Sequence, residues 1–84
     1  MIDAALLAKI ADRIDGHIDA DPDPWAAATL DALAIAYGAR SRFANGTHEL
    51  KLAGVTVTST SGGKNLIRTW QAKARRLVAE QVAR

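Results

Sequence analysis

The chain contains no cysteine, and this absence excludes a disulfide framework and a thiolate metal site. Aromatic residues are also few, with two Trp, one Tyr and one Phe among 84 residues. Because the apolar residues are mainly Ala, Leu, Ile and Val, we expect closely packed helices around one modest core. No apolar run approaches the roughly 20 residues that span a bilayer, and no signal-peptide pattern is present. We therefore expect residues 1–84 to form a single intracellular domain with no membrane partner.

Charge is unevenly distributed along the chain. Residues 1–37 contain seven Asp and two basic residues, a net charge of −5. Residues 38–84 contain nine Lys or Arg and two Glu, a net charge of +7. This asymmetry predicts a charged partner or head-to-tail self-association. Alternatively, the two halves neutralise each other within the fold.

Residues 47–60, T-H-E-L-K-L-A-G-V-T-V-T-S-T, show the alternation and β-branched enrichment of a half-buried hairpin. A two-residue turn at Ala53 and Gly54 would pair Leu52 with Val55. The same register places four apolar side chains on one face, namely Leu50, Leu52, Val55 and Val57. A slip of one residue would scatter them between faces, so the pattern itself predicts the register. An isolated hairpin is marginal in water, and we expect this one to pack on helices.

Two helices are expected before the hairpin. Residues 3–18 carry an apolar stripe at three- and four-residue spacing, with Asp3 as the N-cap. The second helix is expected from Pro24 to Arg42 or Ala44, with Asp23 as the N-cap. Its expected core-facing residues include Trp25, Leu30, Leu33, Ala34 and Tyr37, with Phe43 as a further candidate.

The ends of the second helix carry two alternative interpretations each. The run D-A-D-P-D-P at 19–24 resembles the start of a calcium loop but lacks its glycine and final glutamate, so capping is the preferred interpretation. Gly38 is either an interior glycine or an early stop, whereas Asn45-Gly46 is the stronger terminator. With that terminator, Arg40 and Arg42 would lie in the last turn, where the helix dipole favours cations.

A third helix is expected over residues 64–82, with Thr60 or Ser61 as its N-cap. Its apolar face is formed by Leu66, Ile67, Trp70, Ala74, Leu77 and Val78. A second stripe of Lys64, Arg68, Gln71 and Arg75 is expected on the solvent side. The predicted architecture is therefore α+β, with a helix at 1–20 and a helix–hairpin–helix core at 24–84.

No motif supports an enzyme. S-G-G-K at 61–64 lacks the spacing of a phosphate-binding P-loop and is interpreted as a flexible helix entry. His48 and Glu49 are neighbours in a strand, so their side chains point to opposite faces. His17 has no second ligand at metal spacing. We predict no catalytic residues, no cofactor and no metal.

The basic residues of the last helix are the predicted partner-binding face, formed by Lys64, Arg68, Lys73, Arg75 and Arg76. They are open to three interpretations: a solvated surface, a salt-sensitive phosphate-binding surface, or a docking surface for acidic groups of a protein. Loss of DNA binding in the Arg68→Glu, Arg75→Glu double variant would support the phosphate-binding interpretation.

Residues 24–82 combine the order helix, hairpin, helix with three segments: L-D-A-L-A-I-A-Y-G-A-R, G-V-T-V-T-S-T-S and N-L-I-R-T-W. In this order and in these segments the chain resembles the lambda W-type head–tail joining proteins of tailed phages. Members of that family are compact αββα domains that bind beneath the portal ring and help to form the docking surface for the tail. This chain differs by its added N-terminal helix and by the absence of an aromatic residue in its second strand.

The resemblance implies a small non-enzymatic virion-assembly protein, located in the virion or the host cytoplasm. Its expected partners are the portal or other virion proteins and further copies in a homo-oligomeric ring. The alternative hypothesis is a phage- or plasmid-type nucleic-acid-binding or regulatory protein that uses the basic last helix.

Overall fold

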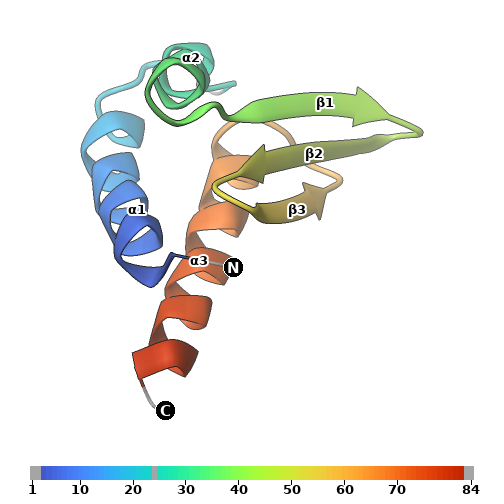
Figure 1. Cartoon of the computed structure of the whole chain (residues 1–84). Coiled ribbons are helices and arrows are strands. Elements are labelled where there is room, and N and C mark those ends of the chain that lie inside the picture. The colour runs from blue at the N-terminus through green and yellow to red at the C-terminus, as the bar shows by residue number, and fades with distance from the viewer. Residues whose placement is uncertain (1–2, 24, 83–84) are drawn as a thin grey trace.

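The computed structural model describes residues 3–23 and 25–82 and has an α+β architecture (Figure 1). Within these residues, three helices accompany an antiparallel sheet with the strand order β1-β2-β3. The elements are α1 (Ala4–Ile18), α2 (Ala27–Tyr37), β1 (Arg40–Ala44), β2 (Thr47–Leu52), β3 (Val55–Ser59) and α3 (Lys64–Val82). The α+β class predicted from the sequence is confirmed.

The predicted hairpin is present in the predicted register. Leu52 pairs with Val55 and Leu50 with Val57, and all four side chains are buried. The turn between them uses positive φ values at Ala53 (52°) and Gly54 (81°), which match the right-handed twist of the strands. The hydrophobic pattern was therefore sufficient to predict both the pairing and the buried face.

The second helix is shorter than predicted, and its expected last turns form a strand instead. Gly38 adopts φ 72° and its N–H donates to Ala34 O at 2.9 Å, so the early stop is the correct alternative. Asn45 and Gly46 have φ values of 54° and 74° and form the turn between β1 and β2. The prediction that Arg40 and Arg42 end a helix is wrong because both lie on β1.

The acidic linker caps α2, although through a different aspartate than predicted. The N-cap position is occupied by Ala26. Asp21, only 7% exposed, accepts from Thr29 N at 3.2 Å and from Thr29 Oγ1 at 3.0 Å. The Asp23 N–H also donates to Asp21 at 2.9 Å, and this bond is the main reason that the pKa of Asp21 is lowered, against the effect of burial. Pro24, expected at the first helical position, lies outside the described residues.

The start of α3 also differs slightly from the prediction. The helix begins at Lys64, and the first intrahelical bond runs from Ile67 N to Gly63 O at 3.1 Å. Gly63 therefore holds the N-cap position expected for Thr60 or Ser61. At the other predicted cap, Asp3 accepts from Leu6 N at 3.1 Å and begins α1 as expected.

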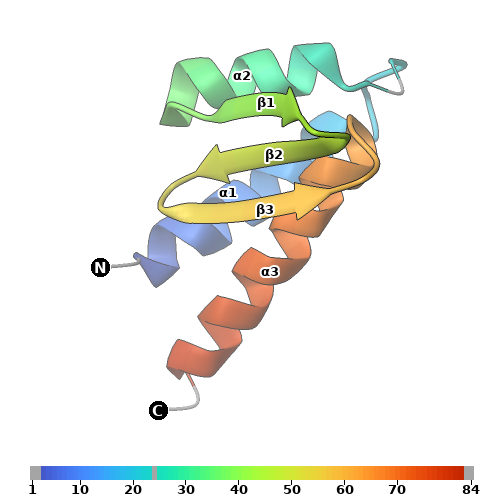
Figure 2. The ribbon, with the colours of Figure 1, turned by 90° about the vertical axis from the view of Figure 1, so that its right-hand side faces the viewer.

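The core lies between the sheet and the pair α1 and α3, which cover one face of the sheet (Figure 2). Trp70 is fully buried, and its indole N–H is shared by Leu52 O and Val55 O at 3.2 Å each. This bond fixes the β2–β3 turn to α3. Trp25 and Phe43, both expected in the core, are 63% and 62% exposed. The prediction for Phe43 is wrong because the chain turns into a strand after Gly38, and that for Trp25 is wrong because α2 begins only at Ala27. Ala34, also expected to face the core, is exposed.

Candidate interaction site

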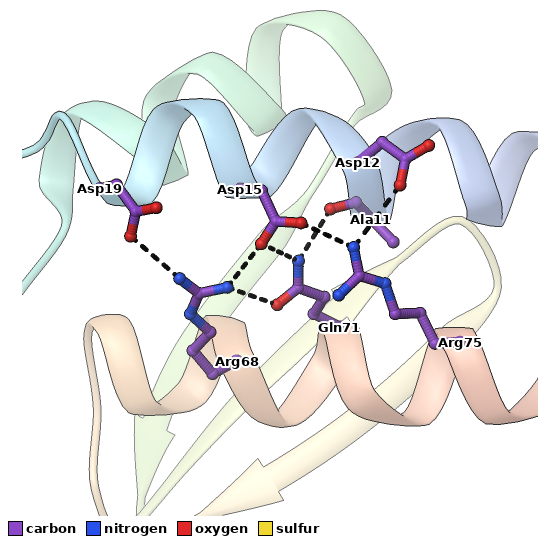
Figure 3. A network of polar contacts seen from close by, with 7 residues as sticks. All are labelled: Ala11, Asp12, Asp15, Asp19, Arg68, Gln71 and Arg75. Atoms are coloured by element: carbon purple, nitrogen blue, oxygen red, sulfur yellow. Dashed lines mark hydrogen bonds and ion pairs between the residues drawn. The ribbon is translucent and has the colours of Figure 1, made fainter.

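Two of the predicted partner-binding residues, Arg68 and Arg75, are bonded to α1 (Figure 3). Arg68 contacts Asp15 at 2.7 Å and Asp19 at 3.1 Å. Arg75 contacts Asp15 at 2.7 Å and Asp12 at 3.5 Å. At this contact the acidic and basic halves of the chain neutralise each other, as one of the two alternatives predicted.

Gln71 joins the same cluster from the buried side, with 4% of its surface exposed. Its amide nitrogen donates to Ala11 O at 2.8 Å and to Asp15 at 2.9 Å, while its oxygen accepts from Arg68 at 2.8 Å. The prediction that Gln71 faces solvent is wrong. We call Asp12, Asp15, Asp19, Arg68, Gln71 and Arg75 the α1–α3 polar cluster.

Hydrogen bonding shifts the pKa values of two members of the polar cluster. The bonds from Arg75, Gln71 and Arg68 hold the pKa of Asp15 well below its usual range. The bond to Asp15 in turn raises the pKa of Arg75. Both groups stay ionised at neutral pH, so the ion pairs of the polar cluster link α1 to α3 at that pH.

The other predicted basic residues lie elsewhere on α3. Lys64 is half-buried and close enough to Asp21 to help lower the pKa of that carboxylate. Lys73 donates to Thr56 O at 3.0 Å, and Arg76 is exposed beside it. Lys73 and Arg76 line a hollow of about 510 Å³ between β3 and α3. The five residues therefore do not form one continuous face.

The two histidines lie apart from each other in the described structure. His48 and Glu49 point to opposite faces of the sheet, with Glu49 paired to Arg42 at 3.3 Å. His17 is half-buried and lines a separate hollow with Asp21 and Thr29. No group of three His, Cys, Asp or Glu side chains is placed to hold a metal ion within residues 3–23 and 25–82.

A group of aromatic side chains gathers where the start of α2 meets the β1–β2 hairpin. The His48 ring lies 4.5 Å from the Phe43 ring and 6.4 Å from the Trp25 ring, measured between centroids. These side chains line a hollow of about 400 Å³ whose floor includes Leu30 and Leu66. We call this hollow the aromatic groove.

The aromatic groove was not predicted from the sequence, although one pattern could have indicated it. Asn45-Gly46 is the dipeptide most typical of a two-residue hairpin turn, and the alternating residues 47–52 follow it. Pairing outward from that turn sets Phe43 opposite His48. Nothing in the local sequence, however, indicates that Trp25 approaches the same hairpin.

No protein-family model, no curated protein and no solved structure matches the chain. Among the described helices, none combines the length and the apolar composition required to cross a membrane.

Proposed function

We propose that the chain is a small non-enzymatic virion-assembly subunit, a head–tail connector that binds the portal and works in a homo-oligomeric ring. The observation that carries this proposal is the exposed aromatic pair, Trp25 and Phe43, on either side of the aromatic groove. Aromatic side chains are enriched at protein interfaces because they bury a large area at low entropic cost.

The apolar surface of α2 supports the ring. This helix is apolar on nearly all sides, yet its buried side chains are few, and Ile35 is 88% exposed. A helix that is apolar all round is normally buried. The outward face of α2 is therefore a second surface, different from the aromatic groove, that a neighbouring subunit can cover. Rings are built from such unlike surfaces.

Capture by purified portal rings tests the proposal. The chain should co-sediment with the rings in fixed stoichiometry, and Trp25→Ser with Phe43→Ser should remove the binding. The matched control is Thr56→Ser with Thr58→Ser, which changes exposed side chains at β3, the opposite edge of the sheet. A monomer that does not co-sediment with the portal would contradict the proposal. Portal binding by the aromatic double variant would contradict it as well.

A nucleic-acid function is the second candidate, and the hollow beside Lys73 and Arg76 is what favours it. This hollow is open and is flanked by threonines of β3. If it binds phosphates, Lys73→Glu with Arg76→Glu should weaken duplex-DNA binding and lower the salt slope by about 2. DNA binding that is unchanged in this variant would exclude the hollow as the site.

A further inference from the structure

Strand β1 is an open edge of the sheet. All five of its residues are exposed. Ala44 and Thr47 flank the two-residue turn and therefore form a hydrogen-bonded pair. Alternation along the ladder then turns the N–H and C=O groups of Ser41 and Phe43 away from β2, toward the open edge.

The two edges of the sheet are protected differently. At the β3 edge, Lys73 Nζ donates a hydrogen bond to the outward carbonyl oxygen of Thr56 at 3.0 Å. Within residues 3–23 and 25–82, no hydrogen bond reaches the outward backbone groups of Ser41 or Phe43. Natural proteins usually block such edges with charges, bulges or covering segments. Arg40 and Arg42 place such charges on β1, but the outward backbone groups have no hydrogen-bond partner among the described residues, so the edge offers a template for a strand of opposite charge.

The two faces of the sheet carry different side chains at the β1 edge. The core-facing side opens into the aromatic groove, lined by Trp25, Phe43 and His48. The outer side carries Arg40 and Arg42, with Lys51 directly opposite Arg40 on β2. Glu49 is the acidic residue among these outward positions and already pairs with Arg42. An added strand would meet apolar surface on one side and basic side chains on the other.

We propose that the β1 edge binds an extended segment of a partner protein in which acidic and apolar residues alternate. The inference rests on the proposed protein-binding function and names the kind of segment that would be bound. The segment adds a fourth strand, and its backbone bonds to Ser41 and Phe43. Its residues opposite Arg40 and Arg42 are acidic, and its apolar residues enter the aromatic groove.

The same charges argue against a second copy of the chain at this edge. If β1 paired antiparallel with a second copy through its outward groups, Ser41 of one copy would pair with Phe43 of the other. Arg42 would then lie at the centre of the pairing. Each Arg42 would then face its own copy across the new pair of strands. Like charges directly opposite each other are destabilising, so an acidic strand fits this edge better than β1 itself.

Binding of a short synthetic peptide in which Glu and Val alternate tests the inference, measured by titration at low salt. Ser41→Pro removes one outward N–H from β1, and proline is tolerated where the N–H of an edge strand faces solvent. Because one backbone bond is lost, the peptide should bind about tenfold more weakly. The matched control is Thr58→Pro, which removes an outward N–H at the β3 edge and should leave the affinity unchanged.

A charge exchange gives a second readout that does not depend on proline. The Arg40→Glu, Arg42→Glu variant should lose the Glu–Val peptide and gain a Lys–Val peptide. No binding of the Glu–Val peptide, equal losses at the two edges, or a dimer that Ser41→Pro dissolves would each overturn the inference. Portal capture without peptide binding would contradict the inference but not the proposed function. Peptide binding without portal capture would contradict the proposed function but not the binding of a strand at β1.

Discussion

At the scale of single residues, Gly62 sets the position of the His48 ring. A Cβ atom added at Gly62 would lie 2.7 Å from His48 Nδ1 and 3.1 Å from its Cγ. The Phe43 ring also lies close to the His48 ring, 4.5 Å away between centroids. The glycine therefore permits the close approach of the α3 entry loop to β2, and with it the floor of the aromatic groove.

Two glycine substitutions should have opposite effects on stability. Gly62→Ala should destabilise the fold by about 1–3 kcal/mol because the His48 ring must move from its packed position. Gly16→Ala should stabilise it by about 0.5–1 kcal/mol, since Gly16 lies inside α1 with nothing within 4 Å of the added Cβ. Urea unfolding of both variants measures the difference. Equal effects of the two substitutions would contradict the packing described for His48.

Two aspartates should make the protein sensitive to acid. The folded-state pKa values of Asp15 and Asp21 are lowered by the hydrogen bonds that these carboxylates accept. Their contribution is therefore complete above the unfolded-state pKa of about 4 and is lost as the pH falls through the folded-state values. The free energy of unfolding should fall below about pH 4, and less steeply in Asp15→Asn and Asp21→Asn. Urea unfolding across a pH series measures the slopes, and unchanged slopes would contradict the assignment.

At the scale of elements, the hairpin could be predicted, whereas the end of α2 could be predicted only as one of two alternatives. Four apolar side chains had to share one face of residues 47–60, and a single register satisfies that condition. Residues 39–44 gave no such constraint, because every residue of β1 is exposed and nothing in its pattern distinguishes strand from helix. What makes it a strand is pairing with β2, a tertiary contact that begins at Asn45-Gly46.

The basic residues of α3 show the same limit of prediction, since a sequence pattern does not reveal tertiary neighbours. Helical spacing placed Arg68 and Arg75 on one stripe, and the structure agrees with that stripe. The stripe does not reveal what lies against it, and here it is the acidic side of α1. The aromatic groove was hidden for the same reason, since its residues come from the α2 entry, β1 and β2.

Reversing the charge of the stripe should therefore weaken the fold as well as any binding. Arg68→Glu with Arg75→Glu places two carboxylates against Asp12, Asp15 and Asp19 and should lower the urea midpoint clearly. Arg76→Glu should change the free energy of unfolding by no more than about 0.5 kcal/mol, because Arg76 is exposed away from the polar cluster. A double variant as stable as the parent would show that the polar cluster contributes little. DNA-binding tests should accordingly use Lys73 and Arg76.

At the scale of the whole molecule, Asp12, Asp15 and Asp19 are paired with Arg68 and Arg75 inside one chain, so we expect assembly to rely on other surfaces. Two apolar surfaces are available, the aromatic groove and the outward face of α2. Because the polar cluster neutralises these charges, we expect apolar contact rather than charge attraction to hold the proposed ring together.

Self-association should therefore depend on Ile35. If the outward face of α2 meets a neighbouring subunit, Ile35→Asp should shift the protein to monomer in sedimentation velocity, with little change in stability. The matched control Thr58→Asp places the same charge on the exposed face of β3. Oligomers that persist in Ile35→Asp, or that Thr58→Asp dissolves equally, would contradict a ring interface on α2.

The pairing of α1 with α3 also determines when the domain can be completed during synthesis. The isoleucine stripe of α1 packs mainly against a helix that begins at Lys64, so α1 leaves the ribosome before the helix that covers it. Until α3 emerges, Ile10 and Ile14 lack their main packing partner, and Asp15 has neither arginine beside it. We therefore expect closure of the chain across this span to be a late folding step, since the separate helices and the sheet are marginal on their own.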